Sequence, residues 1–182
     1  MTRSSKPRPP NPLGTALVTG ASSGIGEALA HRFAAAGFDL VVVARSQPKL
    51  EVLAKQLAAQ HGVAVRVVLS DLAQPGAVNT IHHQLSRQKC AVTALVNCAG
   101  VLEQGLFTSI GAPSHQQIID LNISALTAMV HAFLPDMVAR GHGRVLNVAS
   151  VAAFQPVPSL ASYAASKAYV LSLSESLAEE LR

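Results

Sequence analysis

Short apolar runs rich in Val, Leu and Ala recur along the chain, and stretches with a helical spacing of apolar residues separate them. Continuous apolar runs of this length are typical of strands that are buried on both faces of a parallel sheet. We therefore predict strands at Ala16–Thr19, Leu40–Ala44, Val63–Leu69, Thr93–Asn97 and Arg144–Ala149.

The stretches between these runs show the i, i+3, i+4 periodicity of amphipathic helices, most clearly from Leu50 to Ala58. Gly37 is the expected C-terminal cap of the first helix, and Ser114 is the expected N-terminal cap of the long fourth helix. The predicted helices are Ile25–Ala36, the segment around Leu50–Ala58, Gly76–Arg87, Ser114–Ala139 and Ser162–Arg182.

Regular alternation of strands and helices predicts βαβ units, and right-handed crossovers then give an α/β fold with a doubly wound parallel sheet of the Rossmann type. One such dinucleotide-binding domain accounts for Leu13–Arg182. The last predicted helix is still amphipathic at Arg182, and no strand follows it. We expect the last strands of the fold to be missing, which leaves the fifth strand as a bare sheet edge.

Composition excludes several other classes of protein. Hydrophobic residues make up 49% of the chain and charged residues 13%, unlike a disordered chain. The most apolar window, Ile118–Leu134, contains Asp120, Asn122 and His131, so we interpret it as a buried helix and expect no membrane span.

The positive charge is concentrated at one end of the chain. The net charge of +4 falls to +1 without Arg3, Lys6 and Arg8. We predict that residues 1–12 form a disordered basic tail; a targeting or partner-binding arm is the alternative. No basic patch with interleaved aromatic residues follows, so we expect no nucleic-acid partner.

Cysteine and histidine usage indicates neither disulfides nor metal. Cys90 and Cys98 do not form a C-x-x-C pair, and no histidines have metal-ligand spacing. We interpret Cys98 as a small buried hydrophobic residue, and the expected compartment is the cytoplasm.

A glycine-rich turn, Thr19–Gly26, joins the first predicted strand to the first helix. Gly20 permits a tight turn, Gly24 permits close approach of a pyrophosphate, and Gly26 permits close packing of helix on strand. The free amides and the positive end of the helix dipole then bind phosphate. A purely structural turn is the alternative. The predicted cofactor-binding residues of this turn are Gly20, Ser22, Ser23, Gly24, Ile25 and Gly26.

The end of the second strand indicates which dinucleotide is bound. An acidic residue at this point would bind the ribose 2′-hydroxyl of NAD, but the chain has Arg45 and Ser46. An arginine can pair with the 2′-phosphate of NADP through charge-assisted hydrogen bonds. We therefore predict NADP in preference to NAD, the alternative being an exposed arginine in a loop.

Five motifs in order resemble those of the short-chain dehydrogenase/reductase family. They are Thr19–Gly26, the sequence Asn97-Cys98-Ala99-Gly100, a helical Asn122, Ser150 after the fifth strand, and Tyr163-Ala164-Ala165-Ser166-Lys167. The resemblance implies that Asp71 and Leu72 flank the adenine, and that Asn97, Ala99 and Gly100 line the ribose side. It also implies that Lys167 binds the nicotinamide ribose, and that Asn122 holds a water that relays protons. For Asn122 the alternative is a polar residue that faces solvent.

The spacing of Tyr163 and Lys167 has a chemical meaning of its own. The two side chains lie four residues apart on one predicted helix and so share a face. An ammonium beside a phenol lowers the pKa of the phenol, which makes proton exchange with an alcohol or carbonyl feasible. Ser150, at the carboxyl end of a strand, can hydrogen-bond the reacting oxygen. The alternatives are a core-facing tyrosine beside a solvated lysine, and a serine that only caps a turn.

These observations predict an oxidoreductase that transfers a hydride between NADP(H) and a small-molecule carbonyl/secondary alcohol pair. Catalysis is expected from Asn122, Ser150, Tyr163 and Lys167. In the family, further strands and a substrate-covering segment follow the last helix, and full-length members form homodimers or homotetramers. A catalytically impaired dinucleotide-binding or interaction protein is therefore the alternative. The apolar loops Val101–Pro113 and Val151–Leu160 indicate a hydrophobic substrate.

Overall fold

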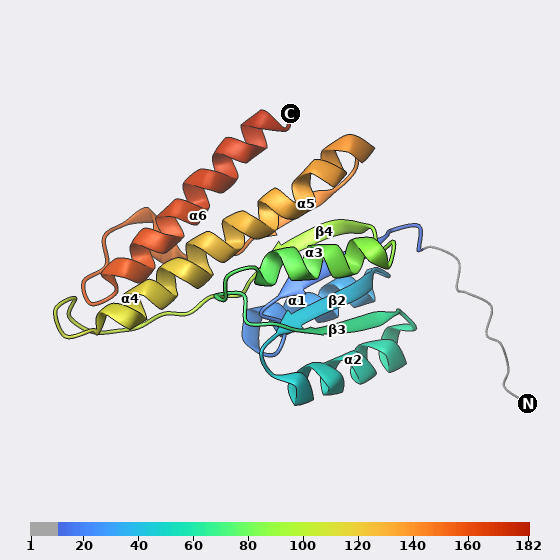
Figure 1. The fold of residues 1–182 in the computed structure, drawn as a ribbon, viewed down its shortest axis with the longest axis horizontal. Helices are drawn as coiled ribbons and strands as arrows, with labels where there is room; N and C mark the ends of the chain where they lie inside the picture. Colours follow the sequence, from blue (N-terminus) through green and yellow to red (C-terminus); the bar gives the residue numbers. More distant parts are fainter. Residues whose placement is uncertain (1–10) are drawn as a thin grey trace, which may run out of the picture.

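The computed structural model describes residues 11–182. Five parallel strands form its central sheet in the order β3-β2-β1-β4-β5, with helices on both faces (Figure 1). The predicted doubly wound α/β fold is confirmed, because the chain winds outward from β1 to β3 and then returns to place β4 on the other side of β1. The strands are β1 (Thr15–Thr19), β2 (Asp39–Ala44), β3 (Val65–Leu69), β4 (Val92–Asn97) and β5 (Arg144–Asn147).

Two hydrophobic clusters hold the helices to the two faces of the sheet. One cluster joins one face of the sheet to α1 and α2, and the other joins the opposite face to α3, α5 and α6. The regular helices are α1 (Gly24–Ala35), α2 (Gln47–His61), α3 (Ala77–Arg87), α4 (Ala112–Ile119), α5 (Leu126–Arg140) and α6 (Ala161–Glu180). A short 3-10 helix, η2 (Val151–Phe154), precedes α6.

The long fourth helix differs from its prediction in two respects. It begins at Ala112 after Gly111, not at Ser114, and no side chain caps it. Pro113 lies in the first turn, where its fixed φ and missing N–H suit a helix start. A π-helical segment, η1 (Asp120–Ala125), separates α4 from α5. The helix is therefore continuous, but its middle is widened at Asn122.

Most of the predicted tail lies outside the described residues, which begin at Asn11. The Asn11 amide donates a hydrogen bond to the carbonyl oxygen of Gly37, at 2.8 Å. Gly37 itself has a φ of +92°, as expected of a residue that ends a helix. These contacts attach the start of the described chain to the end of α1.

One helix among the described residues, Ala112–Arg140, is long and apolar enough to cross a membrane by length and composition alone. Its buried side chains include Leu126, Met129 and Phe133, and they pack in the cluster that also contains Leu95 of β4. A core helix of this kind passes the same test, so the finding carries little weight.

Candidate active site

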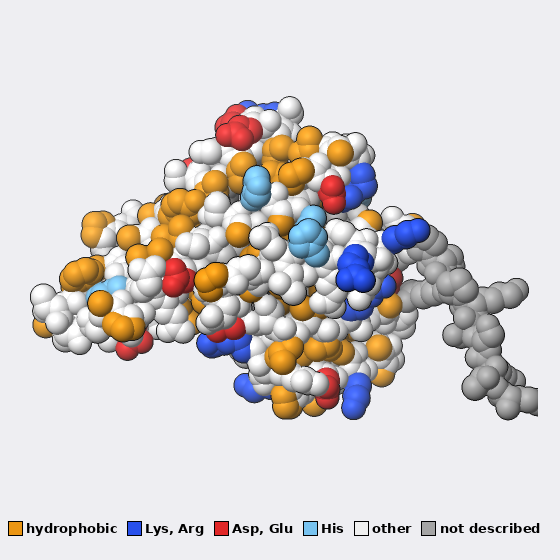
Figure 2. All heavy atoms as spheres, viewed as in Figure 1, with side chains coloured by type: hydrophobic (Ala, Val, Ile, Leu, Met, Phe, Trp, Pro, Cys, Tyr) orange, Lys and Arg blue, Asp and Glu red, His pale blue; other side chains and the backbone are white. Residues whose placement is uncertain are grey.

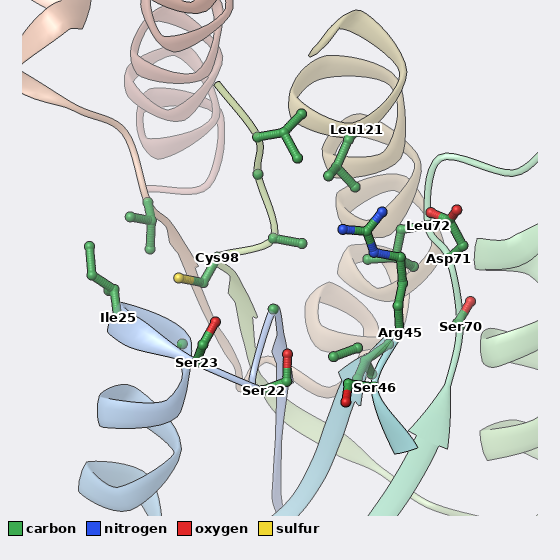
Figure 3. A pocket seen from close by; sticks show the side chains of 18 of the residues that line it. Ser22, Ser23, Ile25, Arg45, Ser46, Ser70, Asp71, Leu72, Cys98 and Leu121 are labelled. Carbon is green, nitrogen blue, oxygen red and sulfur yellow. The ribbon is translucent and has the colours of Figure 1, made fainter. Parts of the chain in front are cut away.

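A cleft of about 910 Å³ opens at the carboxyl ends of β1, β2 and β4. This is the point at which the strand order reverses, since β2 and β4 lie on opposite sides of β1. Ligands of doubly wound proteins bind at such switch points. Figure 3 shows Ser22 and Ser23 in the turn before α1, with Arg45 projecting from the end of β2 toward Asp71 and Leu72.

Gly20 and Gly26 have the tight geometry that the sequence predicts for the glycine turn. Gly20 has a φ of +67°, and a Cβ added to it would lie 2.9 Å from the backbone N and Cα of Ala99. A Cβ on Gly26 would collide with the carbonyl oxygen of Gly20. Gly24, with a φ of +59°, faces open space at the start of α1. Gly20 and Gly26 are thus needed for close packing, and Gly24 is needed for its backbone conformation.

Thr19 joins this turn to the turn after β4. Its Oγ1 accepts hydrogen bonds from the backbone N–H groups of Cys98 and Ala99, at 3.0 and 3.1 Å. The same hydroxyl donates to the carbonyl oxygen of Val96. The two turns that line the cleft therefore form one unit. Sequence reasoning included Thr19 in the motif without assigning it this role.

The part of the cleft beside β2 and β3 contains the expected residues and two further polar ones. Arg45 is exposed at the end of β2, and Asp71 accepts a hydrogen bond from the N–H of Ala73 at 3.2 Å. Lys49 and Ser70 also line this part of the cleft, although the sequence analysis did not select them. Lys49 follows Arg45 by four residues, a proximity that could have identified it.

Tyr163 and Lys167 lie at the other end of the cleft. The Lys167 Nζ lies 5.8 Å from the centre of the Tyr163 ring and donates to the carbonyl oxygen of Val148 at 2.8 Å. Burial lowers the pKa of Lys167, because an ammonium is less stable away from water. Burial raises the pKa of the nearby Cys98 thiol, and the charge of Lys167 partly offsets that effect.

Asn122 is buried behind the cleft with only 1% of its surface exposed, so it does not face solvent. Its Oδ1 accepts from the N–H of Val101, and its Nδ2 donates to the carbonyl oxygen of the same residue, both at 2.9 Å. The Nδ2 also donates to Ser166 Oγ at 3.0 Å. The π-helical segment thus carries the residue that joins the loop after β4 to α6. Such segments are frequent at functional sites.

The structure brings most of the predicted residues together around the cleft. Those that line it are Gly20, Ser22, Ser23, Ile25, Gly26, Arg45, Ser46, Asp71, Leu72, Ala99, Gly100, Tyr163 and Lys167. Four others do not line it. Gly24 and Asn122 are described above, and Asn97 is 3% exposed with its amide directed to Asn147 of β5. Ser150 accepts a hydrogen bond from the N–H of Ala152 at 3.1 Å and caps η2.

A switch-point cleft with a glycine turn against a helix N-terminus defines a dinucleotide-binding protein of the Rossmann type. The family model for short chain dehydrogenases matches residues 14–182, so the chain belongs to the short-chain dehydrogenase family, a family of oxidoreductases.

Solved structures of similar proteins have the same fold. The chain is 40% identical to a short-chain dehydrogenase from Sphingobium yanoikuyae in complex with NADPH, with a TM-score of 0.87, and covers 65% of it using 92% of its own residues. It is 37% identical to a bulky-bulky ketone specific alcohol dehydrogenase from Comamonas testosteroni, with a TM-score of 0.87, and the match covers 92% of this chain and 67% of that one.

A human relative bears on activity. The chain is 34% identical over 167 residues to the Homo sapiens protein named inactive hydroxysteroid dehydrogenase-like protein 1. The match covers 91% of this chain and 50% of the relative. The chain thus spans about half the length of this relative. Proteins similar to this chain thus include one that is named inactive.

Proposed function

We propose that this chain binds NADP(H) and oxidises or reduces a carbonyl/secondary alcohol pair, with Tyr163 as the proton donor or acceptor. The observation that carries the proposal is the position of Tyr163 and Lys167 in one cleft with the glycine turn. The similar dehydrogenase from Sphingobium yanoikuyae, solved in complex with NADPH, supports the cofactor.

The residues present fit an NADP molecule. Gly24 has open space beside it at the start of α1, and its neighbours Ser23 and Ile25 line the cleft, so a phosphate can approach the helix N-terminus there. Arg45 and Lys49 supply positive charge on the side where a 2′-phosphate would lie. When bound, the nicotinamide ring supplies or takes up the hydride.

Proton transfer is assigned to the Tyr163 hydroxyl. In the reductive direction this hydroxyl gives its proton to the carbonyl oxygen of the substrate, and in the oxidative direction it takes the proton of the alcohol. Lys167 supplies positive charge beside the Tyr163 ring, and its bond to Val148 keeps its Nζ in place. Ser150 does not line the cleft itself but follows Ala149, which does. Its Oγ uses a lone pair to accept from Ala152, so its own O–H remains available, and we assign that O–H to the substrate oxygen. Asn122 fixes the Val101 backbone that lines the cleft.

The exposed hydrophobic side chains around α4, η2 and the start of α6 favour a hydrophobic carbonyl compound as the substrate class. Figure 2 shows hydrophobic side chains gathered over the end of the molecule formed by α4 and the start of α6. Leu102, Val151 and Phe154 are more than half exposed, and η2 packs against α6. The related enzyme from Comamonas testosteroni is named for bulky ketones.

The substitution Tyr163→Phe tests the proposal. We expect turnover to fall by about 10²-fold or more, the usual size of an acid–base contribution, while NADPH binding is retained. Tyr169→Phe is the matched control, since Tyr169 lies on the same helix with its hydroxyl bonded to Thr127 at 2.9 Å. Equal turnover of wild type and Tyr163→Phe would remove Tyr163 from the mechanism.

A catalytically impaired dinucleotide-binding protein is the second candidate. It is favoured by the half-length match to a relative that is named inactive. NADPH binding, measured as a rise in melting temperature, without NADPH oxidation across a panel of small and bulky ketones would support it over the enzyme.

A further inference from the structure

Three polar side chains form a chain of hydrogen bonds across the interface between the sheet and α6. Asn97 Nδ2 donates to Asn147 Oδ1 at 2.9 Å, and Asn147 Nδ2 donates to Ser174 Oγ at 2.9 Å. Ser174 in turn donates to the carbonyl oxygen of Val170 at 2.6 Å. Asn97 and Asn147 are register partners on β4 and β5, so their side chains lie on the same face of the sheet.

This polar chain is directly connected to Lys167 through the backbone. Val148 follows Asn147, and its N–H donates to the carbonyl oxygen of Asn97 at 2.9 Å. Its own carbonyl oxygen is the acceptor for Lys167 Nζ. The place of the Lys167 amine therefore depends on the direction of the Val148 peptide. Ser174 lies seven residues after Lys167, about two helical turns further along α6.

The stability of the fold alone does not explain this chain of hydrogen-bonded polar side chains. Asn97 Oδ1 is buried and has no hydrogen-bond partner among the described residues, and an unpaired buried acceptor is unfavourable. Apolar side chains at the same two strand positions would continue the neighbouring pair of Leu95 and Val145 without that cost. Directional bonds, in contrast, fix α6 along its axis and about it, which apolar packing does less strictly.

We propose that Asn147 is a positioning residue: through Ser174 it fixes α6 on the sheet, and through the adjoining Val148 carbonyl it holds the Lys167 amine beside Tyr163. The part that concerns turnover rests on the proposed function. The part that concerns the Lys167 amine does not, since it can be measured in protein without activity.

Serine variants of α6 provide matched tests. Ser174→Ala removes the acceptor of Asn147, whereas Ser174→Thr keeps the hydroxyl. Ser176→Ala is the control, because Ser176 makes the same kind of bond to the carbonyl four residues earlier, Ser172, at 2.9 Å but is exposed. Asn147→Leu breaks the chain at its centre with a side chain of similar size.

The first readout is NMR titration of the Lys167 amine, assigned by its absence in Lys167→Met. We expect the pH at which it titrates to move toward that of an ordinary lysine in Ser174→Ala and Asn147→Leu, and to stay unchanged in Ser174→Thr and Ser176→Ala. A lower melting temperature in Ser174→Ala with an unaltered Lys167 titration would show a purely structural role and overturn the proposal.

The second readout is steady-state kinetics with a ketone. We expect kcat to fall about ten- to a hundredfold in Ser174→Ala, as for a catalytic group displaced by about 1 Å, with KM for NADPH unchanged. Recovery of kcat in Ser174→Thr would support positioning. A fall of equal size in Ser176→Ala would contradict it. If the wild type has no turnover, the proposed function fails and the Lys167 titration alone decides the role of Asn147.

Discussion

Strands β1 and β5 both end at the functional side of the sheet, yet their surroundings differ. All five residues of β1 are buried, and the strand pairs with β2 on one side and β4 on the other. β5 is an edge strand of four residues, and two of them, Arg144 and Leu146, are exposed. The cofactor side of the cleft therefore rests on the covered centre of the sheet, and the Tyr163 side on its open margin.

The two sides are also held together differently. The glycine turn after β1 is fixed mainly by close backbone contacts, such as that of Gly20 with Ala99, in addition to the hydrogen bonds of the Thr19 hydroxyl. The Lys167 side is fixed by side-chain hydrogen bonds that join distant segments, such as Lys167 to Val148 and Asn122 to Val101. We infer that packing defects will impair the first side, and that the loss of single hydrogen bonds will impair the second.

The largest expected difference is in stability. Leu17 of β1 is fully buried, so Leu17→Ala should lower the free energy of unfolding by about 2–5 kcal/mol, as in other core cavities. Leu146 of β5 is 42% exposed, and Leu146→Ala should change the free energy of unfolding by less than about 0.5 kcal/mol. Urea denaturation of both variants measures the two values. Equal losses would mean that β5 is as well covered as β1.

A smaller effect is expected at the glycine turn. Gly20→Ala would add a Cβ to a residue with positive φ and against the Ala99 backbone, so we expect the Kd for NADPH to rise at least about tenfold. Gly62→Ala is the control, because Gly62 has nearly the same φ, +66°, but open space around it. Its Kd for NADPH should not change. Unaltered NADPH binding in Gly20→Ala would show that the close approach is not needed.

The turn after β1 could be predicted from sequence because its determinants are local. A buried strand, spaced glycines and an amphipathic helix follow one another within about twenty residues. The π-helical segment at Asn122 could not be predicted, since apolar periodicity does not separate it from the α-helix on either side. The π-helical segment carries Asn122, which forms hydrogen bonds with Val101 and Ser166, and both of these residues are distant from it in sequence.

The start of the fourth helix shows a related limit. Ser114 has the side chain of a cap, but Pro113 favours the first turn and the helix starts before both. Asn97 and Ser150 were expected at the cleft because of their motifs. The Asn97 amide donates to Asn147, and Ser150 Oγ accepts from the η2 backbone while its O–H is still available, contacts that only the spatial neighbours reveal. Local patterns thus located the ends of the first four strands correctly, whereas β5 ends at Asn147 and not at Ala149, and they did not give the direction of each side chain.

On the cofactor side, charge can be separated from packing. Arg45→Ala should raise the Kd for NADPH about tenfold, the loss expected for one charge-assisted hydrogen bond, and leave the Kd for NADH nearly unchanged. Lys49→Ala measures the contribution of the second cation that lines the cleft. Isothermal titration of the wild type and both variants with NADPH and with NADH gives the six dissociation constants. An equal effect of Arg45→Ala on both cofactors would argue against a 2′-phosphate site.

The smallest expected effect concerns pH on the Tyr163 side. Burial lowers the pKa of Lys167 below its ordinary value of 10.5, so between the two values the unfolded chain binds more protons than the folded one. Stability attributable to Lys167 therefore rises with pH in that window. The melting temperature of the wild type relative to Lys167→Met should accordingly increase from pH 7 toward pH 10. Cys98, whose pKa is raised above 9.0, acts in the opposite direction above that pH in both proteins. The difference in melting temperature between the wild type and Lys167→Met therefore cancels the contribution of Cys98, apart from the coupling of Cys98 to Lys167. A difference that is flat or falls with pH would mean that Lys167 is as well solvated in the folded protein as in the unfolded chain.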